Sequence, residues 1–536
     1  MQHQIIVNSL LLGAYFAVLL VVGWACRRKA ADVNGFVLGG RAVGPWLTAF
    51  AFGTSYFSAV VFVGYAGQFG WRYGISATWA GIGNALIGSL LAWAVLGRRT
   101  RIMTQHLDSA TMPDFFAKRF GSPGLKLMAS VIIFVFLIPY TASLYNGLSR
   151  LFGMAFSIDY AWCIVLMSVL TAVYVIAGGY MATAINDFIQ GVVMLVGISA
   201  VIWAILESKG GLIAALDGLA RIQGPSLLPG GEPTPGIFTS FLGPDPLNLL
   251  FVVILTSLGT WGLPQMVQKF YAIRNEGAIK KGTIISTLFA FVVAGGCYFL
   301  GGFGRLFSDA LNVGANGVPA GGFDAIIPKM LEGLSPMLIA LVVVLVLSAS
   351  MSTLSSLVIT SSSTLTIDFI NGTVVRKGMS DRRQVLCIRV LIVVFIAISA
   401  TLALVQYKST SPIAFIAQMM GVSWGAMAGA FLAPFLYSLY SKKVTAASCW
   451  VCFVAAPVFT LVGVFCRDAM PDILKSPINT GALAMLGGLV LVPVVNLFTR
   501  RPPKDLVDGS FACYEKTVVV PQATALDGEV ADDLKA

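Results

Sequence analysis

The sequence predicts an all-α protein that crosses a membrane many times. Of its 536 residues, 57% are hydrophobic and only 11% are charged, and the mean hydropathy is +0.85. A soluble domain carries about 25% charged residues. Apolar runs long enough to cross the hydrocarbon recur along almost the whole chain. Since backbone groups inside lipid must pair within their own segment, these runs should be helices.

The hydropathy pattern predicts about 13 transmembrane helices in one domain, residues 1–500. The spans are 5–26, 46–70, 74–97, 124–152, 158–178, 184–206, 247–271, 280–305, 332–368, 386–406, 411–440, 444–466 and 477–499. The first is too long for the apolar core of a signal peptide and should be retained. Residues 501–536 are polar and become acidic, so we expect a disordered cytoplasmic tail.

Basic residues predict the orientation. They cluster after spans one, three, seven, nine, eleven and thirteen, as Arg27–Lys29, Arg98–Arg101, Lys269–Lys281, Arg376–Arg383, Lys442–Lys443 and Arg500–Arg501. Loops rich in Lys and Arg stay in the cytoplasm. The N-terminus should therefore lie outside and the C-terminus inside a plasma membrane, the inner membrane of a bacterium. Charges placed at span ends also argue against nucleic-acid binding, despite a net charge of +11. No obligatory protein partner is evident.

Two spans contain interruptions. Residues 53–58 (GTSYFS) place a short polar run inside the second span, and residues 259–265 (GTWGLPQ) place Pro264 and two glycines inside the seventh. Pro264 lacks an N–H and clashes with the preceding turn, so this helix should break. Paired broken helices indicate a transporter with a binding site at the midplane. The alternative is that Gly and Pro merely kink these helices.

The ninth span carries three hydroxyls on one face. Ser352, Ser355 and Ser356 are spaced i, i+3 and i+4, which aligns them along a helix. Neutral oxygens could bind a monovalent cation that must later leave. They could equally pack against and hydrogen-bond to a neighbouring helix.

Asp187 lies where the chain re-enters the membrane after the fifth span. A carboxylate there is costly and by default marks an ion or proton pathway. The alternative is that Asp187 caps a helix N-terminus, which aspartate does well.

With these features the sequence resembles the sodium/solute symporter family. The resemblance covers roughly residues 5–500 and is carried by residues 38–41 (LGGR), 178–190, 261–270 and 351–355 (MSTLS). It implies the LeuT-type fold, with two inverted repeats of five helices, spans 2–6 (residues 45–206) and spans 7–11 (residues 247–440).

The resemblance also implies where sodium binds. The main site would use the backbone carbonyls of Thr54, Phe57 and Ala349 with the hydroxyls of Ser352 and Thr353. Some members have a second sodium site, whose pattern Asp187, Ser352, Ser355 and Ser356 match. The expected coupling ions are therefore one or two Na+.

The solute is expected to be a small organic molecule bearing a carboxylate. Where proline-type members have an aspartate, this chain has Tyr56, and residues 186–197 look closer to pantothenate- and monocarboxylate-type members. Helix N-termini at the breaks would favour a carboxylate. The expected cavity residues are Tyr56, Ser58, Tyr140, Tyr145, Trp261, Gln265 and Gln418, although each aromatic could instead pack between helices. An amino acid such as proline, a sugar or sialic acid are the alternatives.

The resulting hypothesis is a sodium-coupled symporter that works by alternating access and is not an enzyme. Proton coupling through Asp187 is one rival. A passive channel is another, although few central polar residues line these spans. An enzyme is less consistent with the sequence, because it has only His3 and His106 and no recognisable nucleophile motif.

Overall fold

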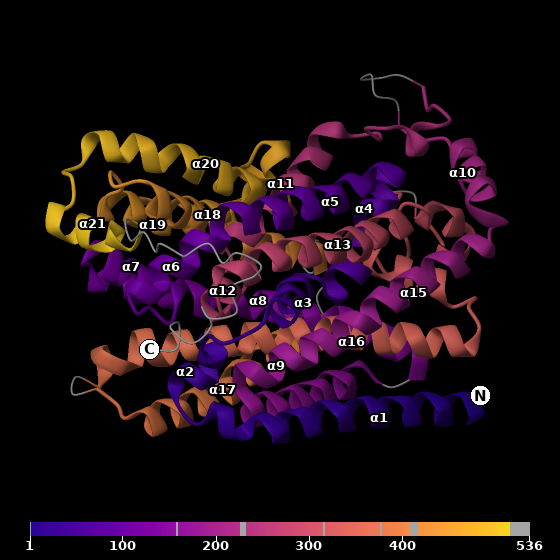
Figure 1. The fold of residues 1–536 in the computed structure, drawn as a ribbon. Coiled ribbons are helices and arrows are strands. Elements are labelled where there is room, and N and C mark those ends of the chain that lie inside the picture. The colour runs from indigo at the N-terminus through magenta and orange to yellow at the C-terminus, as the bar shows by residue number, and fades with distance from the viewer. Residues whose placement is uncertain are drawn as a thin grey trace, which may run out of the picture.

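In the computed structural model, the chain is a bundle of long helices that run side by side (Figure 1). The structure describes residues 2–156, 159–225, 232–314, 317–375, 378–407 and 416–514. Over these ranges there is no β-strand, only isolated backbone bridges. The predicted all-α class is confirmed for the described part of the chain.

Helices able to cross a membrane dominate the bundle. In the described ranges nine helices are long and apolar enough, and the bent pair α11–α12 makes a tenth. These nine are the continuous helical stretch Val60–His106 with α8 (Pro123–Phe156), α9 (Tyr160–Glu207), α13 (Glu276–Gly301), α16 (Pro336–Thr364), α17 (Asp381–Tyr407), α18 (Ile416–Tyr440), α19 (Ala446–Phe465) and α20 (Pro477–Phe498), and α1 (Gln2–Cys26) is a further helix outside this count. A multi-pass membrane protein is thereby confirmed, whereas the count of 13 spans and the orientation stay predictions.

Shorter helices connect or extend these spans. They are α2 (Val33–Leu38), α5 (Thr78–Gly83), α6 (Arg98–His106), α7 (Met112–Phe120), α10 (Gly211–Arg221), α14 (Ser308–Leu311), α15 (Ile326–Leu331) and α21 (Lys504–Phe511). Between α5 and α6 the helix continues in π-helical form over Asn84–Leu91 and Trp93–Gly97. A further π-helical segment, Leu365–Val374, extends α16.

Helix α9 is two helices joined at a glycine. Its 48 residues would measure about 72 Å if straight, against roughly 30 Å of hydrocarbon. Gly179 has φ 56° and ψ −155°, a conformation open essentially to glycine alone. A Cβ there would also lie 3.1 Å from Ala30 and Phe36. The break falls between the predicted spans 158–178 and 184–206.

Both predicted interruptions are present. Helix α3 (Pro45–Tyr56) ends before the extended Phe57, and the chain resumes as the π-helical segment Val60–Tyr65 and α4 (Ala66–Tyr73). Helices α11 (Pro246–Gly262) and α12 (Pro264–Ala272) differ in direction by 44°. Leu263 between them is extended, because a following proline disfavours helical backbone.

Helix α16 lies in the centre of the bundle. It packs against α3, α8 and α9, and every residue from Val342 to Thr364 is buried. Its hydroxyls therefore face protein and not lipid, where they can hydrogen-bond to neighbouring helices.

The beginning of the C-terminal segment is ordered. Helix α21 is followed by Tyr514, whose hydroxyl donates to the Arg99 carbonyl at 3.0 Å, while Asp508 pairs with Lys442 at 2.9 Å. Residues 504–514 are thus docked on the bundle and do not belong to the disordered tail that the sequence suggested. Residues 515–536 lie outside the described part.

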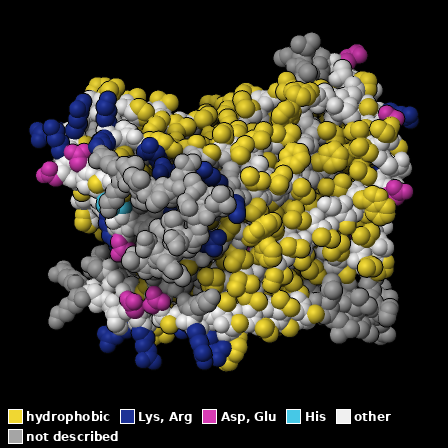
Figure 2. All heavy atoms as spheres, viewed as in Figure 1, with side chains coloured by type: hydrophobic (Ala, Val, Ile, Leu, Met, Phe, Trp, Pro, Cys, Tyr) yellow, Lys and Arg dark blue, Asp and Glu magenta, His cyan; other side chains and the backbone are white. Residues whose placement is uncertain are grey.

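Hydrophobic and basic side chains occupy different parts of the surface. Figure 2 shows a broad hydrophobic surface over the middle of the molecule. Most Lys and Arg side chains on this face gather toward the end where α6, α7 and α21 lie (Figures 1 and 2).

Candidate functional site

Five buried oxygen atoms meet where the break after α3 faces the middle of α16. The Ser352 hydroxyl lies 3.1 Å from the Thr54 carbonyl oxygen and 3.0 Å from that of Ala349. The Thr353 hydroxyl lies 3.0 Å from Thr54 O, 3.1 Å from Ala349 O and 3.3 Å from Phe57 O. The structure brings together all five oxygens predicted for the main sodium site. We call this cluster the five-oxygen site.

The break in α3 is what frees these carbonyls. The last backbone bond of α3 runs from the Phe57 N–H to Gly53 O at 3.1 Å, and Phe57 itself is extended. The Thr54 carbonyl is left beyond the helical ladder, where the two hydroxyls of α16 reach it. Orphan carbonyls at a helix end need partners, and these are buried away from water.

The five-oxygen site has more acceptors than protons. Ser352 and Thr353 supply one hydroxyl proton each, yet three carbonyl oxygens lie within reach, and carbonyls only accept. A hard cation would satisfy all five oxygens at once. None of the five carries a formal charge, which suits a monovalent ion that binds and then leaves.

Asp187 is buried in the second half of α9. It is fully buried, and neither carboxylate oxygen has a hydrogen-bond partner among the described residues. It lies eight residues beyond the break at Gly179, inside the helix, so it does not cap an N-terminus. Ser355 and Ser356 of α16 are also buried, and Ser355 donates to Ser352 O at 2.9 Å.

A lysine lies beside this predicted second site. The sequence analysis placed Lys269 in a cytoplasmic basic cluster, but the side chain is only 2% exposed within α12. Its ammonium donates to Ser356 Oγ at 3.0 Å, and its field acts on Asp187. The signal was present, since Lys269 falls inside the predicted span 247–271, where a charge is costly.

Four tyrosines and a tryptophan lie together in the buried interior next to the α3 break. We call Tyr56, Tyr65, Tyr140, Tyr298 and Trp424 the aromatic cluster. The Trp424 ring lies 5.7 Å from Tyr56 and 6.0 Å from Tyr140, and Tyr56 is near Tyr65 and Tyr298. The Tyr56 hydroxyl interacts with Tyr298 and the Tyr140 hydroxyl with the Trp424 indole, whereas the Tyr65 hydroxyl has no hydrogen-bond partner in the described structure. Polar groups among aromatic faces are typical of a solute site.

The other predicted cavity residues divide into two groups. Ser58 accepts from the Val60 N–H at 3.2 Å, Trp261 donates to Ile87 O at 2.9 Å, and Tyr145 lies near Ser168 of α9. Ser58 and Trp261 thus have local hydrogen-bond partners, and Tyr145 faces α9. Gln265 is buried beside the α11–α12 break with its amide unpartnered.

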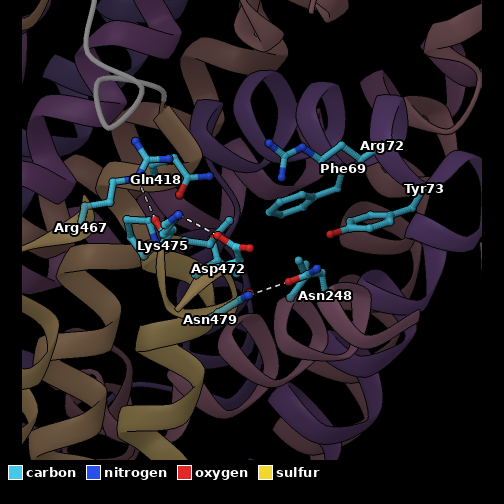
Figure 3. Close-up of a pocket in the computed structure, with 13 residues that line it drawn as sticks. Phe69, Arg72, Tyr73, Asn248, Gln418, Arg467, Asp472, Lys475 and Asn479 are labelled. Atoms are coloured by element: carbon cyan, nitrogen blue, oxygen red, sulfur yellow. Dashed lines mark hydrogen bonds and ion pairs between the residues drawn. The ribbon is translucent and has the colours of Figure 1, made fainter. Parts of the chain in front are cut away.

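Gln418 lines a cavity of about 260 Å³ near the start of α11, which we call the upper cavity (Figure 3). Its labelled lining residues are Phe69, Arg72, Tyr73, Asn248, Gln418, Arg467, Asp472, Lys475 and Asn479. Lys475 pairs with Asp472 at 2.7 Å, whereas neither arginine has a carboxylate partner in the described residues. Phe69 lines this cavity and also contacts the aromatic cluster, because its ring lies 4.9 Å from Tyr65 and 6.5 Å from Tyr298.

The opposite end of the broken spans is closed. Just before α3, the Val43 N–H donates to Ala272 O at 3.2 Å, and the Arg274 N–H donates to Val43 O at 3.0 Å. Arg41 donates to Ser109 O at 2.7 Å on the same side. The site is therefore sealed at the end where α12 finishes, and the upper cavity lies at the end where α11 begins.

Sequence patterns did not predict that Tyr65, Tyr298, Trp424 and Lys269 lie at the site. No spacing rule relates the three aromatic residues, since they come from three separate spans. Only the packing of those helices places the rings around one space.

Comparisons with known proteins agree with this geometry. The profile of the sodium:solute symporter family matches residues 36–454. An osmoregulated proline transporter of Bacillus subtilis is 27% identical over 507 residues, which cover 94% of this chain and 96% of the relative. Sodium/proline symporter 2 of Staphylococcus saprophyticus is 28% identical over 439 residues, or 80% of this chain and 81% of the relative.

A solved structure shares the fold. A Na+-coupled sialic acid symporter, solved in a substrate-bound outward-open state, superposes with a TM-score of 0.71 at 17% identity, over 93% of this chain and 99% of that one. The two relatives are named for proline, so the expected preference for an organic acid finds no support among them. The family assignment rests on the match to 36–454: this chain is a member of the sodium:solute symporter family.

Proposed function

We propose that this chain imports a small zwitterionic amino acid of the proline class together with sodium. The observation that carries the coupling of solute to sodium is the position of Tyr56. The carbonyls of Thr54 and Phe57 on either side of it belong to the five-oxygen site, and its ring belongs to the aromatic cluster. An ion bound to these carbonyls would fix the backbone that presents Tyr56 to the solute. Ion and solute would thus stabilise each other's sites.

Transport proceeds by opening the two ends of the site in turn, first the end at the upper cavity and then the end at Val43 and Ala272. Sodium enters from the upper cavity and holds α3 against α16, and the solute then binds in the aromatic cluster. The upper cavity then closes. Val43 separates from Ala272 at the opposite end, and this opens the route to the cytoplasm. Each sodium ion moved inward gains about 2.3 kcal/mol per 100 mV.

The chemistry of the aromatic cluster supports a zwitterion. Tyrosine hydroxyls and the N–H groups freed at the breaks can donate to a carboxylate. Ring faces attract an ammonium group at close range. The names of the relatives add proline as the leading candidate.

A monocarboxylate is the second candidate, and Tyr56 favours it. In place of the aspartate of proline-type members, Tyr56 offers no negative charge to an ammonium group. The two candidate solutes differ in the net charge that one transport cycle moves across the membrane. Carrying one Na+ with a zwitterion moves one net positive charge, whereas carrying one Na+ with a monoanion moves none.

The proposal includes a topology. We assign 13 spans, an outer N-terminus and a cytoplasmic C-terminus, with repeats over residues 45–206 and 247–440. The gathering of Lys and Arg at the end of α6, α7 and α21 supports this orientation (Figure 2). The upper cavity would then face the outside.

Uptake into proteoliposomes tests the function. Labelled proline should accumulate with an inward sodium gradient, saturate, and accelerate when the interior is negative. Small monocarboxylates and sugars serve as competitors. Voltage-independent accumulation of a monocarboxylate would select the second candidate. A pH gradient that fully replaces sodium would show proton coupling, and flux that equilibrates without accumulation would show a channel.

A further inference from the structure

We infer that the Lys269 ammonium fills the second cation site, so that this chain carries one sodium ion per solute. The inference rests on the proposed function and specifies its ion stoichiometry. The residues that the sequence suggested as a second sodium site, Asp187, Ser355 and Ser356, are each buried, as is this lysine.

The contacts of Lys269 place its charge at that site. The ammonium donates to Ser356 Oγ at 3.0 Å and lies 5.0 Å from the centre of the Tyr180 ring. Ser356 Oγ is in turn 2.8 Å from Ser55 Oγ, one residue after Thr54 of the five-oxygen site. Lys269 of α12 thus contacts α16 directly and is linked to α3 through Ser356.

Asp187 supplies the opposite charge. Both of its carboxylate oxygens are buried without a hydrogen bond in the described structure, and Lys269 is the charged group whose field acts on them. An ionised carboxylate buried without hydrogen bonds is stabilised by a nearby cation. In this chain the nearby cation is the Lys269 ammonium, which is part of α12 and cannot dissociate.

The charge count excludes a second mobile ion. With Lys269 in place, the carboxylate of Asp187 is already balanced. A sodium ion bound between Asp187 and Ser356 would face the ammonium at short range, with only one negative charge for two cations. Ser355 donates to the carbonyl of Ser352, whose hydroxyl belongs to the five-oxygen site, and none of the five oxygens there comes from a charged side chain.

Equilibrium binding of radioactive sodium alone to the purified full chain tests this. We expect one ion per chain. The Lys269→Met variant leaves Asp187 unbalanced and frees the space beside Ser356, so it should bind two. The matched control Lys281→Met, at an exposed position on α13, should still bind one.

Two ions bound by the wild type would overturn the inference, as would a folded Lys269→Met variant that still binds one. If Lys269→Met does not fold, the charge-neutral double variant Asp187→Asn, Lys269→Met should recover a monodisperse protein that binds one ion. Equal loss of folding in the single and double variants would overturn the pairing. No sodium bound by the wild type would instead refute the five-oxygen site and the proposed function.

Discussion

The Thr353 hydroxyl oxygen lies 3.0 Å from the Thr54 carbonyl oxygen, although 299 residues separate the two positions in the chain. The contact joins the broken α3 to the central α16. It is the shortest of the three contacts that Thr353 makes to carbonyl oxygens of the five-oxygen site.

Removing the Thr353 hydroxyl should weaken sodium binding. Thr353→Ala deletes one oxygen ligand from a helix that accepts alanine well. If that ligand contributes about 1.4 kcal/mol, the apparent sodium affinity falls about tenfold. The sodium dependence of uptake at saturating solute measures this change. Thr353→Ser keeps the oxygen and should stay near the wild type, and unaltered sodium dependence in a Ser352→Ala, Thr353→Ala double variant would refute the site.

Removing the Tyr56 hydroxyl should affect solute more than sodium. Tyr56→Phe keeps the ring, while the neighbouring carbonyls of Thr54 and Phe57 stay available to the ion. A hydrogen bond to a charged solute group contributes about 1.5–3 kcal/mol, so KM for the solute should rise roughly tenfold or more. Tyr145→Phe is the control, because Tyr145 lies near Ser168 and not in the aromatic cluster. Equal effects of both changes on KM would argue against the cluster as the solute site.

A methyl group at Gly259 should displace Trp424. A Cβ at this position would lie 2.4 Å from the Trp424 ring, closer than carbon atoms can approach. Gly259→Ala should therefore raise KM for the solute by about fivefold or more, which corresponds to ~1 kcal/mol of lost aromatic contact. Gly277→Ala on α13 meets only an ordinary contact at 3.7 Å and should transport normally. Normal KM in both variants would show that Trp424 does not touch the solute.

The upper cavity should discriminate solutes by charge. Arg72 and Arg467 make it electropositive, since Lys475 is already paired with Asp472. Arg72→Gln should slow the capture of an anionic solute several-fold at low salt and much less at high salt, because salt screens such attraction. A net-neutral zwitterion should be affected little. Lys329→Gln, which alters an exposed pair with Glu332, is the control.

Much of the fold could be predicted from the sequence because its causes are local. Hydropathy located every long helix, and Pro264 specified the α11–α12 break through its missing N–H and its effect on Leu263. The polar run at residues 53–58 likewise indicated the end of α3. The C-terminal segment was predicted less well, because Tyr514 and Asp508 are ordered by partners elsewhere in the chain.

The residues of the five-oxygen site were predicted from sequence motifs, whereas the distances between their oxygens could be learned only from the folded structure. Ser352 and Thr353 are neighbours in the sequence, yet nothing in it measures their distance to Thr54. The aromatic cluster could be predicted only in part, since Tyr56 and Tyr140 were expected while Tyr298 and Trp424 were not. Rings from four spans meet only when the helices pack.

The sequence by itself determined a multi-pass helical membrane protein with two broken spans, a hydroxyl-rich central helix and one intramembrane carboxylate. Tertiary structure alone decided which cation accompanies that carboxylate. Lys269 and Ser356 lie 87 residues apart, and the sequence placed Lys269 both at the end of a predicted span and in a basic cluster expected in the cytoplasm. Helix packing buried it instead, because a lysine on the inner face of α12 cannot reach water while α12 stays against α3 and α16. Electrostatic partners depend on distance in space, and the order of residues along a chain does not encode that distance directly.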